Sequence, residues 1–217
     1  MIQLHHFPST ASMVPHILLQ EIGVPFGLVL VDRTHDVQKS AAYLRLNPNG
    51  LIPVLTDGDL VLYETAAIAL HLCDTHPASG LAPALGSPER AHFYKWLMWL
   101  TNTLQSTLMI YFYPERWVKA GNATGQTEVR SHAEWRIRVL LDQLDTELSR
   151  HGGPWLLGET YTALDPYLFT LCRWTRDFAQ TPPARDRRHL GPHLQRMLER
   201  PAVQRALAAE GLQAPFV

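Results

Sequence analysis

The chain has 217 residues, of which 46% are hydrophobic, and it carries a formal net charge of -1 at pH 7. This length and composition predict a globular protein of one large or two modest domains, long enough to bury a core. The balanced charge excludes bulk electrostatic attraction to nucleic acid or to a membrane surface, so we expect a small molecule as the partner.

The cysteines and the N-terminal residues indicate the cellular compartment of the protein. The only cysteines are Cys73 and Cys172, which are far apart and form no Cys-x-x-Cys pair. This pattern fits a reducing compartment and gives neither a disulfide framework nor a dithiol redox centre. The chain opens on a strand-like pattern rather than a signal peptide, and no apolar run approaches the roughly 20 residues that span a bilayer. We expect a soluble cytoplasmic protein.

The first quarter of the chain alternates between strand and helix patterns. Residues 2–7 and 26–31 are typical of strands, and apolar residues at helical spacing between them predict a helix that ends at Gly23. Two strands joined through a helix imply a parallel pair. A short helical stretch follows at 38–46.

Residues 47–65 contain the densest set of structural signals in the chain, because they predict a turn, a β-hairpin and a helix start in succession. Asn-Pro-Asn-Gly at 47–50 is a dense turn signal, and Asp57-Gly58 lies between two apolar runs as in a β-hairpin. Pro53 cannot donate to a sheet ladder, and its ring keeps Ile52 extended. The backbone N–H and C=O of Ile52 are therefore available to a peptide-like ligand. A strongly helical segment begins at Thr65.

The remainder is helical. Residues 77–87 contain prolines and glycines with weak periodicity and are typical of a linker. Ser87-Pro88 predicts a helix start, and an aromatic-rich helix should run from 93 to 113. Further helices are expected over 129–148, 190–198 and 202–207. Thr162-Ala-Leu-Asp165 predicts a capping box at the start of another, with Asp165 structural rather than catalytic.

The run Asn-Pro-x-Gly-x-Ile-Pro-Val, a hairpin, and Glu-Thr at a helix start resembles the glutathione-binding half of cytosolic glutathione transferases, and the order of elements agrees over almost the whole chain. The resemblance implies a thioredoxin-like α/β domain at 1–76, a linker at 77–87 and an all-helical domain at 88–217 that lines the electrophile site. It further implies glutathione as co-substrate, conjugation to small hydrophobic electrophiles, and a homodimer whose interface joins one subunit's first domain to the other's second.

Carried across residue by residue, the resemblance gives the glutathione site. Pro53 is the cis-proline, and Ile52, next to Leu51, is the residue whose backbone pairs with the cysteinyl part of glutathione. Glu64 and Thr65 hold the γ-glutamyl end. The glycyl carboxylate needs a cation, for which Lys39 ranks ahead of His35.

The loop at 8–12 should stabilise the glutathione thiolate. Lowering a thiol pKa by about two requires roughly 2.7 kcal/mol, and one hydrogen bond to a charged group supplies about 1.5 to 3 kcal/mol. Ser9 ranks first by its alignment with phi- and theta-like enzymes, Ser12 second and Thr10 third. Ala11 stands where the similar beta-class motif has a cysteine, which excludes mixed-disulfide chemistry there. The alternative for Ser12 is a helix cap, with Ser9 and Thr10 as solvated loop residues.

Among residues of the helical domain, the resemblance places Asn102, Gln105 and Tyr113 at the electrophile site, with Gln105 in the place of a beta-class histidine. Metal binding is not expected. His5 and His6 are adjacent on a strand and point to opposite faces, and His189 and His193 straddle Gly191-Pro192, which should interrupt a helix.

Two other function classes stay open. A glutathione-dependent peroxidase, thiol transferase or dehalogenase would keep the same glutathione site, and a non-catalytic binding or scaffold protein would keep the fold.

Overall fold

A computed structural model describes residues 1–178 and 180–217. The chain forms two compact units, Met1–Pro83 with Met197–Phe216, and Ala84–Arg196 with Val217. The C-terminal segment thus belongs to the first unit. The domain limits 1–76 and 88–217 and the linker at 77–87 stay predictions.

The first unit is built on a four-stranded mixed sheet in the order β2-β1-β3-β4. Its strands are β1 (Ile2–His6), β2 (Phe26–Leu30), β3 (Val54–Asp57) and β4 (Leu60–Tyr63). β1 pairs in parallel with β2 and antiparallel with β3. The predicted parallel pair and the hairpin are confirmed, with Gly58 and Asp59 as the hairpin's two loop residues.

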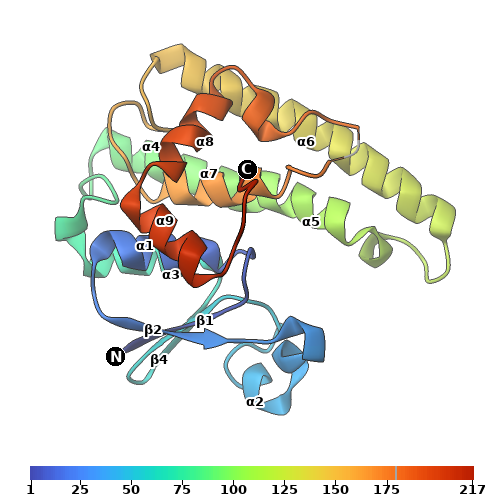
Figure 1. Cartoon of the computed structure of the whole chain (residues 1–217), viewed down its shortest axis with the longest axis horizontal. Helices are drawn as coiled ribbons and strands as arrows, with labels where there is room; N and C mark the ends of the chain where they lie inside the picture. The colour runs from blue at the N-terminus through green and yellow to red at the C-terminus, as the bar shows by residue number, and fades with distance from the viewer. Residues whose placement is uncertain (179) are drawn as a thin grey trace. The chain divides into compact units, whose positions relative to one another are not determined.

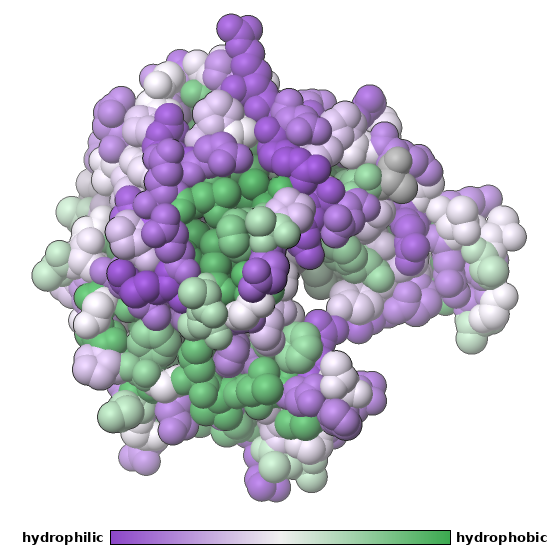
Figure 2. All heavy atoms as spheres, viewed as in Figure 1, coloured by the Kyte–Doolittle hydropathy of each residue, from purple (hydrophilic) through white to green (hydrophobic). Residues whose placement is uncertain are grey.

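The helices of the first unit pack in layers against this sheet (Figure 1). They are α1 (Met13–Ile22), α2 (Ala41–Leu44), α3 (Thr65–Thr75) and α9 (Pro201–Ala209). α1 and α3 lie side by side next to the sheet, and α9 packs on α1. Hydrophobic side chains gather over the strands of this unit on the face shown in Figure 2.

The helix expected over 38–46 is shorter and split. A 3₁₀ turn covers Val37–Lys39, and α2 covers only Ala41–Leu44. Between them Ser40 is extended, with ψ of 149°, and its hydroxyl accepts the N–H of Tyr43 at 3.2 Å. A helix N-cap therefore interrupts the predicted helix.

The second unit is helical. Its helices are α4 (Pro88–Trp99), α5 (Ser106–Phe112), α6 (Ala123–His151), α7 (Leu164–Arg173) and most of α8 (Leu190–Leu198). Ser87 caps α4 through the N–H of Arg90 at 3.1 Å, as predicted. The helix expected over 93–113 is continuous in direction but contains a π-helical segment at Leu100–Gln105. Gly191 and Pro192 lie in the first turn of α8, where proline is tolerated, so the predicted interruption is wrong.

α7 forms the core of the helical unit, because every one of its residues is buried. Asp165 accepts the backbone N–H of Thr162 at 2.8 Å, and the Thr162 hydroxyl accepts the N–H of Leu164 at 3.4 Å. The Asp165 half of the predicted capping box is therefore present, whereas the Thr162 hydroxyl accepts from Leu164 instead of Asp165, and the N-cap residue of α7 is Ala163, which makes no side-chain cap bond. None of the helices in the described part of the chain combines the length and the apolar character that a membrane crossing requires.

Candidate functional site

Strand pairing brings the predicted site segments of the first unit to one end of the sheet. The C-terminal end of β1 lies beside the C-terminal end of β2, because His6 pairs with Leu30. The same end holds the start of β3 and the end of β4, since Val54 pairs with both His5 and Tyr63. The 8–12 loop, the Ile52-Pro53 bond and the start of α3 all adjoin this end.

The 8–12 loop is held by local hydroxyl bonds. The Ser12 hydroxyl is fully buried; it donates to the C=O of Phe7 at 3.1 Å and accepts the Phe7 N–H at 3.3 Å. The Thr10 hydroxyl donates to the same C=O at 2.8 Å and lies 2.9 Å from Ser12 Oγ. Ser12 occupies the N-cap position of α1 but makes no cap hydrogen bond. The helix-cap alternative for Ser12 is therefore wrong, because its hydroxyl closes the loop instead.

Ser9 has an unusual backbone within this loop. It is partly buried, and its φ of 62° lies in the left-handed region that L-residues other than glycine rarely adopt. Its backbone N–H donates to Glu210 Oε2 at 2.8 Å. Strained residues of this kind concentrate at functional sites.

The Ile52-Pro53 peptide bond is cis, as the resemblance implied. Among the described residues, no loop or turn hydrogen bond engages the N–H or C=O of Ile52. The Ile52 side chain packs against the cluster of Val31, Tyr43 and Val54, which anchors the residue while its polar backbone groups stay available. This is the geometry that a backbone clamp for a peptide requires.

Two donors that the sequence reasoning missed hold the neighbouring peptide. The Tyr43 hydroxyl donates to the C=O of Leu51 at 2.9 Å, and Asn47 Nδ2 donates to the same oxygen at 2.8 Å. Burial raises the pKa of Tyr43, so the hydroxyl stays protonated and donates at neutral pH. Asn47 was visible only as a turn former, and nothing in the local pattern paired Tyr43 with Leu51.

The start of α3 places backbone N–H groups beside a carboxylate. The first helical bond runs from the Ile68 N–H to the Glu64 C=O, so the N–H groups of Thr65, Ala66 and Ala67 precede the helical ladder. Glu64 has a φ of 72°, is exposed and makes no cap bond. A helix N-terminus with unused N–H groups favours a carboxylate ligand.

The predicted cations lie at the surface. Lys39 Nζ is 2.9 Å from Asp36 Oδ1, with 70% of its side chain exposed. His35 Nδ1 is 2.7 Å from Asp32 Oδ2 and is 80% exposed. The segment that carries Lys39 packs against the 47–50 turn, because a Cβ on Gly50 would lie 3.1 Å from the C=O of Gln38. Lys39 is thus close in the fold to the loop that precedes Ile52.

In the helical unit, Asn102 and Gln105 lie in the π-helical segment, and Tyr113 directly follows α5 as its C-cap residue. Gln105 Oε1 accepts the hydroxyl of the buried Tyr167 at 2.6 Å, which fixes the amide. Asn102 is exposed, and the Arg116 guanidinium lies 4.1 Å over the Tyr113 ring. π-Helical turns are frequent at functional sites.

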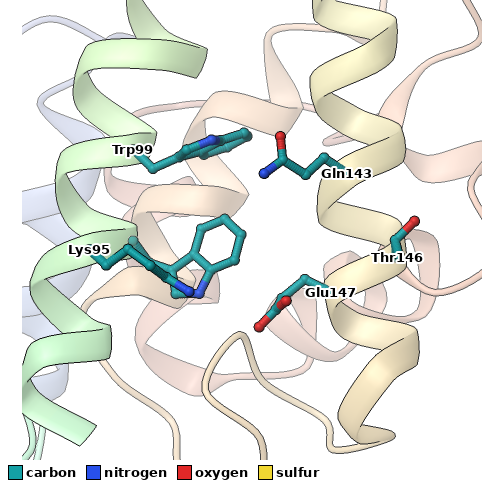
Figure 3. Close-up of a pocket in the computed structure, with 6 residues that line it drawn as sticks. Lys95, Trp99, Gln143, Thr146 and Glu147 are labelled. Atoms are coloured by element: carbon teal, nitrogen blue, oxygen red, sulfur yellow. The ribbon is translucent and has the colours of Figure 1, made fainter. Parts of the chain in front are cut away.

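A separate cavity of about 440 Å³ opens between α4 and α6 in the same unit (Figure 3). Trp99 of α4 and Gln143 of α6 extend toward one another across it. The Trp96 and Trp99 rings meet edge to face with centroids 5.3 Å apart, and Lys95 and Glu147 add one charge of each sign. The lining includes none of Asn102, Gln105 and Tyr113.

The described residues contain no group of three His, Cys, Asp or Glu side chains arranged to hold a metal ion. Cys73 and Cys172 are buried, and neither forms a disulfide there. Burial strongly raises the pKa of Cys172, which keeps its thiol protonated and unreactive.

A thioredoxin-like α/β unit with a cis-proline directly before β3, followed by a helical unit, is the architecture of glutathione-binding proteins. Comparison with known families agrees. The model of the glutathione S-transferase N-terminal domain matches residues 8–75, and that of the glutathione S-transferase C-terminal domain matches residues 100–201.

Relatives match over nearly the whole chain. A glutathione S-transferase of Xanthomonas campestris is 34% identical over 97% of this chain and all of that protein. A sphingomonad glutathione S-transferase solved with glutathione is 32% identical, with a TM-score of 0.82 over 97% of this chain and all of that one. A Sulfitobacter glutathione transferase homologue with bound glutathione is 26% identical, with a TM-score of 0.87 over 98% and 99% of the two chains. The chain belongs to the glutathione S-transferase family, and its enzyme class is that of a transferase.

Proposed function

We propose that this protein conjugates glutathione to small hydrophobic electrophiles. One observation carries the proposal: the Ser9 loop, the Ile52 backbone and the N-terminus of α3 lie at the same end of one sheet, and no loop or turn hydrogen bond of the described residues engages Ile52. Together they supply a hydroxyl for a thiol, a clamp for a peptide backbone and donors for a carboxylate. The relatives solved with glutathione support this choice of ligand.

In the proposed arrangement, Ile52 pairs through its N–H and C=O with the cysteinyl part of glutathione, beside Leu51 and Pro53. The γ-glutamyl carboxylate accepts the N–H groups at the start of α3 and the Thr65 hydroxyl, and Glu64 accepts from the γ-glutamyl ammonium. Lys39 exchanges its exposed ion pair with Asp36 for the glycyl carboxylate, which costs little because exposed pairs contribute about 0 to 1 kcal/mol.

The chemical step requires the thiolate. We assign Ser9 as the hydroxyl that donates to the glutathione sulfur, with the proton of the thiol released to solvent. The sulfur attacks the electrophilic carbon, a C–S bond forms, and the leaving group departs with its bonding electrons. Ser9 ranks first because it aligns with the catalytic serine of phi- and theta-like enzymes. Ser12 and Thr10 rank behind it, and the hydroxyls of both donate to the C=O of Phe7.

We assign Asn102, Gln105 and Tyr113 to the electrophile. Gln105 Oε1 is occupied by Tyr167, whereas its Nε2 makes no hydrogen bond within the described residues, so it retains donors for a polar group on the substrate. The exposed apolar and aromatic side chains of α4 and α5, such as Met98 and Phe112, suit hydrophobic substrates.

The function is tested by calorimetric titration with glutathione and by a conjugation assay with a generic aryl halide, alongside a panel of peroxides and haloalkanes. Heat on titration together with aryl conjugation supports the proposal. Turnover of peroxides or haloalkanes without aryl conjugation would replace it with another glutathione-dependent activity. No heat with glutathione would make the protein a scaffold of the same fold.

We expect Thr65→Val to weaken glutathione binding by about 10- to 150-fold, because the variant loses a hydrogen bond to a carboxylate worth about 1.5 to 3 kcal/mol. Thr75→Val is the matched control, since Thr75 ends the same helix and its hydroxyl donates to the His71 C=O. Calorimetry measures both dissociation constants. Equal losses in the two variants would contradict the γ-glutamyl site.

We also infer a cytoplasmic homodimer. Two buried cysteines without a disulfide fit a reducing compartment. Leu51 of the first unit is 52% exposed beside the clamp, and the tryptophan-walled cavity of the second unit is open. An exposed leucine and an aromatic recess are complementary features for an interface between the first unit of one subunit and the second unit of the other.

Light scattering is expected to give twice the 24.6 kDa mass of one chain for the native protein, and Leu51→Glu should shift it toward one chain. Leu30→Glu is the control, because Leu30 is 59% exposed on the edge strand β2 and is not part of the inferred interface. A native mass of one chain, or a dimer unaffected by Leu51→Glu, would overturn the inferred interface.

A further inference from the structure

Glu210, near the C-terminal end of the sequence, has a buried carboxylate that contacts the 8–12 loop. It directly follows α9, and its side chain is fully buried. Oε2 accepts the backbone N–H of Ser9 at 2.8 Å, and Oε1 lies 2.9 Å from Nδ1 of His16 on α1. The two oxygens thus serve two segments at once.

Burying a carboxylate is unfavourable unless hydrogen bonds compensate the loss of water. Here the compensation comes from one backbone donor and one ring. His16 is itself fully buried, and its Nε2 has no partner within the described residues. A ring whose Nδ1 carries the hydrogen satisfies Glu210 and leaves no unpaired N–H at Nε2.

The surroundings of His16 fix its ring. The His16 ring lies edge to face with Phe26 at 5.8 Å and tilted against His6 at 6.2 Å. Burial lowers the pKa of His6, so His6 is neutral at physiological pH and does not compete as a cation for Glu210. The imidazole is therefore held in place by packing, and the carboxylate is held by the imidazole.

Among the three hydrogen-bonded residues Ser9, Glu210 and His16, the one with a strained backbone is Ser9. A serine with a φ of 62° needs a compensating interaction, and a hydrogen bond from its N–H to a carboxylate is of the strong, charge-assisted kind. The backbone conformation of Ser9 sets the direction of its Cα–Cβ bond, and hence the position of its hydroxyl.

We propose that Glu210, held by His16, is a positioning residue that orients the Ser9 hydroxyl toward the glutathione sulfur. The proposal rests on the proposed function, because it requires Ser9 to stabilise the thiolate. It gives the C-terminal segment of the first unit a role in catalysis. The same segment also docks on α1 through one ion pair, Arg200 with Glu21, and through hydrogen bonds from Arg205 to Gln20, all remote from the 8–12 loop.

Those remote contacts provide a matched control. Arg200 donates to Glu21 at 2.6 and 3.0 Å, and it joins the start of α9 to the end of α1. Glu21→Gln weakens the docking of the same two helices without touching Ser9. A purely structural role for Glu210 would give Glu210→Ala and Glu21→Gln the same functional profile.

The test measures, in the full-length protein, the thiol pKa of bound glutathione from its ultraviolet thiolate absorbance, together with kcat and KM. We expect Glu210→Ala to raise that pKa and to lower kcat by about 10- to 100-fold with little change in the KM for glutathione. Glu210→Gln should retain most activity, because its amide oxygen still accepts the Ser9 N–H and its NH₂ donates to the other tautomer of His16. Glu21→Gln should leave the thiol pKa unchanged.

A double-mutant cycle separates this inference from the proposed function. In a Ser9→Ala background, Glu210→Ala should have no further effect on the thiol pKa, because the hydroxyl it positions is gone. Additive effects, or an unchanged pKa in Glu210→Ala, would overturn the positioning role. If Ser9→Ala itself has no effect, the assignment of Ser9 fails instead.

Should Glu210→Ala not fold, Glu210→Asp takes its place. Its side chain is one methylene shorter and cannot reach both Ser9 and His16, so a smaller rise in the thiol pKa is expected. An unchanged pKa in this variant would equally overturn the proposal.

Discussion

Replacing Ser9 with alanine is expected to raise the thiol pKa of bound glutathione toward the value of about 8.5 for a free thiol and to lower kcat/KM by about 10- to 150-fold. The variant removes one hydroxyl donor to a charged sulfur, an interaction worth about 1.5 to 3 kcal/mol. Alanine retains the Cβ and the backbone N–H, so the bond to Glu210 and the loop conformation stay in place. Steady-state kinetics with an aryl halide and the thiolate absorbance measure the two effects.

Ser12→Ala is the comparison that decides between hydroxyls. Because Ser12 is buried and its hydroxyl bonds to both polar backbone groups of Phe7, we expect lower stability with an unchanged thiol pKa at temperatures where the protein is folded. Thr10→Val tests the third candidate in the same way. If Ser9→Ala leaves both measurements unchanged while Ser12→Ala abolishes the thiolate, the ranking of the two serines is reversed.

Replacing Asp165 with alanine is expected to give a large loss of stability, about 3 to 5 kcal/mol in the free energy of unfolding. Asp165 is fully buried and accepts the N–H groups of Leu156 at 2.9 Å and Thr162 at 2.8 Å. The variant leaves both donors buried without a partner, at about 1 to 3 kcal/mol each, and removes a charge favourable to the start of α7. Urea unfolding measures the change.

His193 does not replace the lost interactions. Its Nε2 lies 4.0 Å from Asp165, and burial lowers its pKa to about 4, so the ring is neutral at physiological pH. Asp142→Ala is the control, because the Asp142 side chain is 59% exposed where it pairs with Arg187 at 2.9 Å, and its removal should cost no more than about 1 kcal/mol. Similar losses for Asp142→Ala and Asp165→Ala would contradict the structural role of the capping box.

Local signals predicted the parts of the fold whose geometry is encoded by adjacent residues. Gly23 ends α1 with a φ of 78°, and Ser87 caps α4 with Pro88 at its first position. The hairpin followed from an Asp-Gly pair between apolar runs. Two predictions about helix continuity were wrong. Ser40 interrupts the helix expected at 38–46, and Pro192 fits into the first turn of α8 without interrupting that helix.

The π-helical segment at Leu100–Gln105 could not be predicted, because its residues suit an α-helix equally well and the extra residue per turn is set by packing. The residues of the candidate site were likewise predictable only where they are adjacent in the sequence. Ile52, Glu64 and Thr65 lie in one contiguous motif, whereas Glu210 is 201 positions from Ser9 and only the tertiary fold brings them together. Tyr43 and Asn47 converge on Leu51 for the same reason.

The proposed mechanism requires Ser9 to keep the thiol of bound glutathione ionised at neutral pH. The most direct measurement is a pH titration of the ultraviolet thiolate absorbance of the native binary complex. A thiol pKa lowered by about two from the free value of about 8.5 is predicted, with most of that shift lost in Ser9→Ala. A bound thiol that titrates as it does in free solution would contradict this role of Ser9.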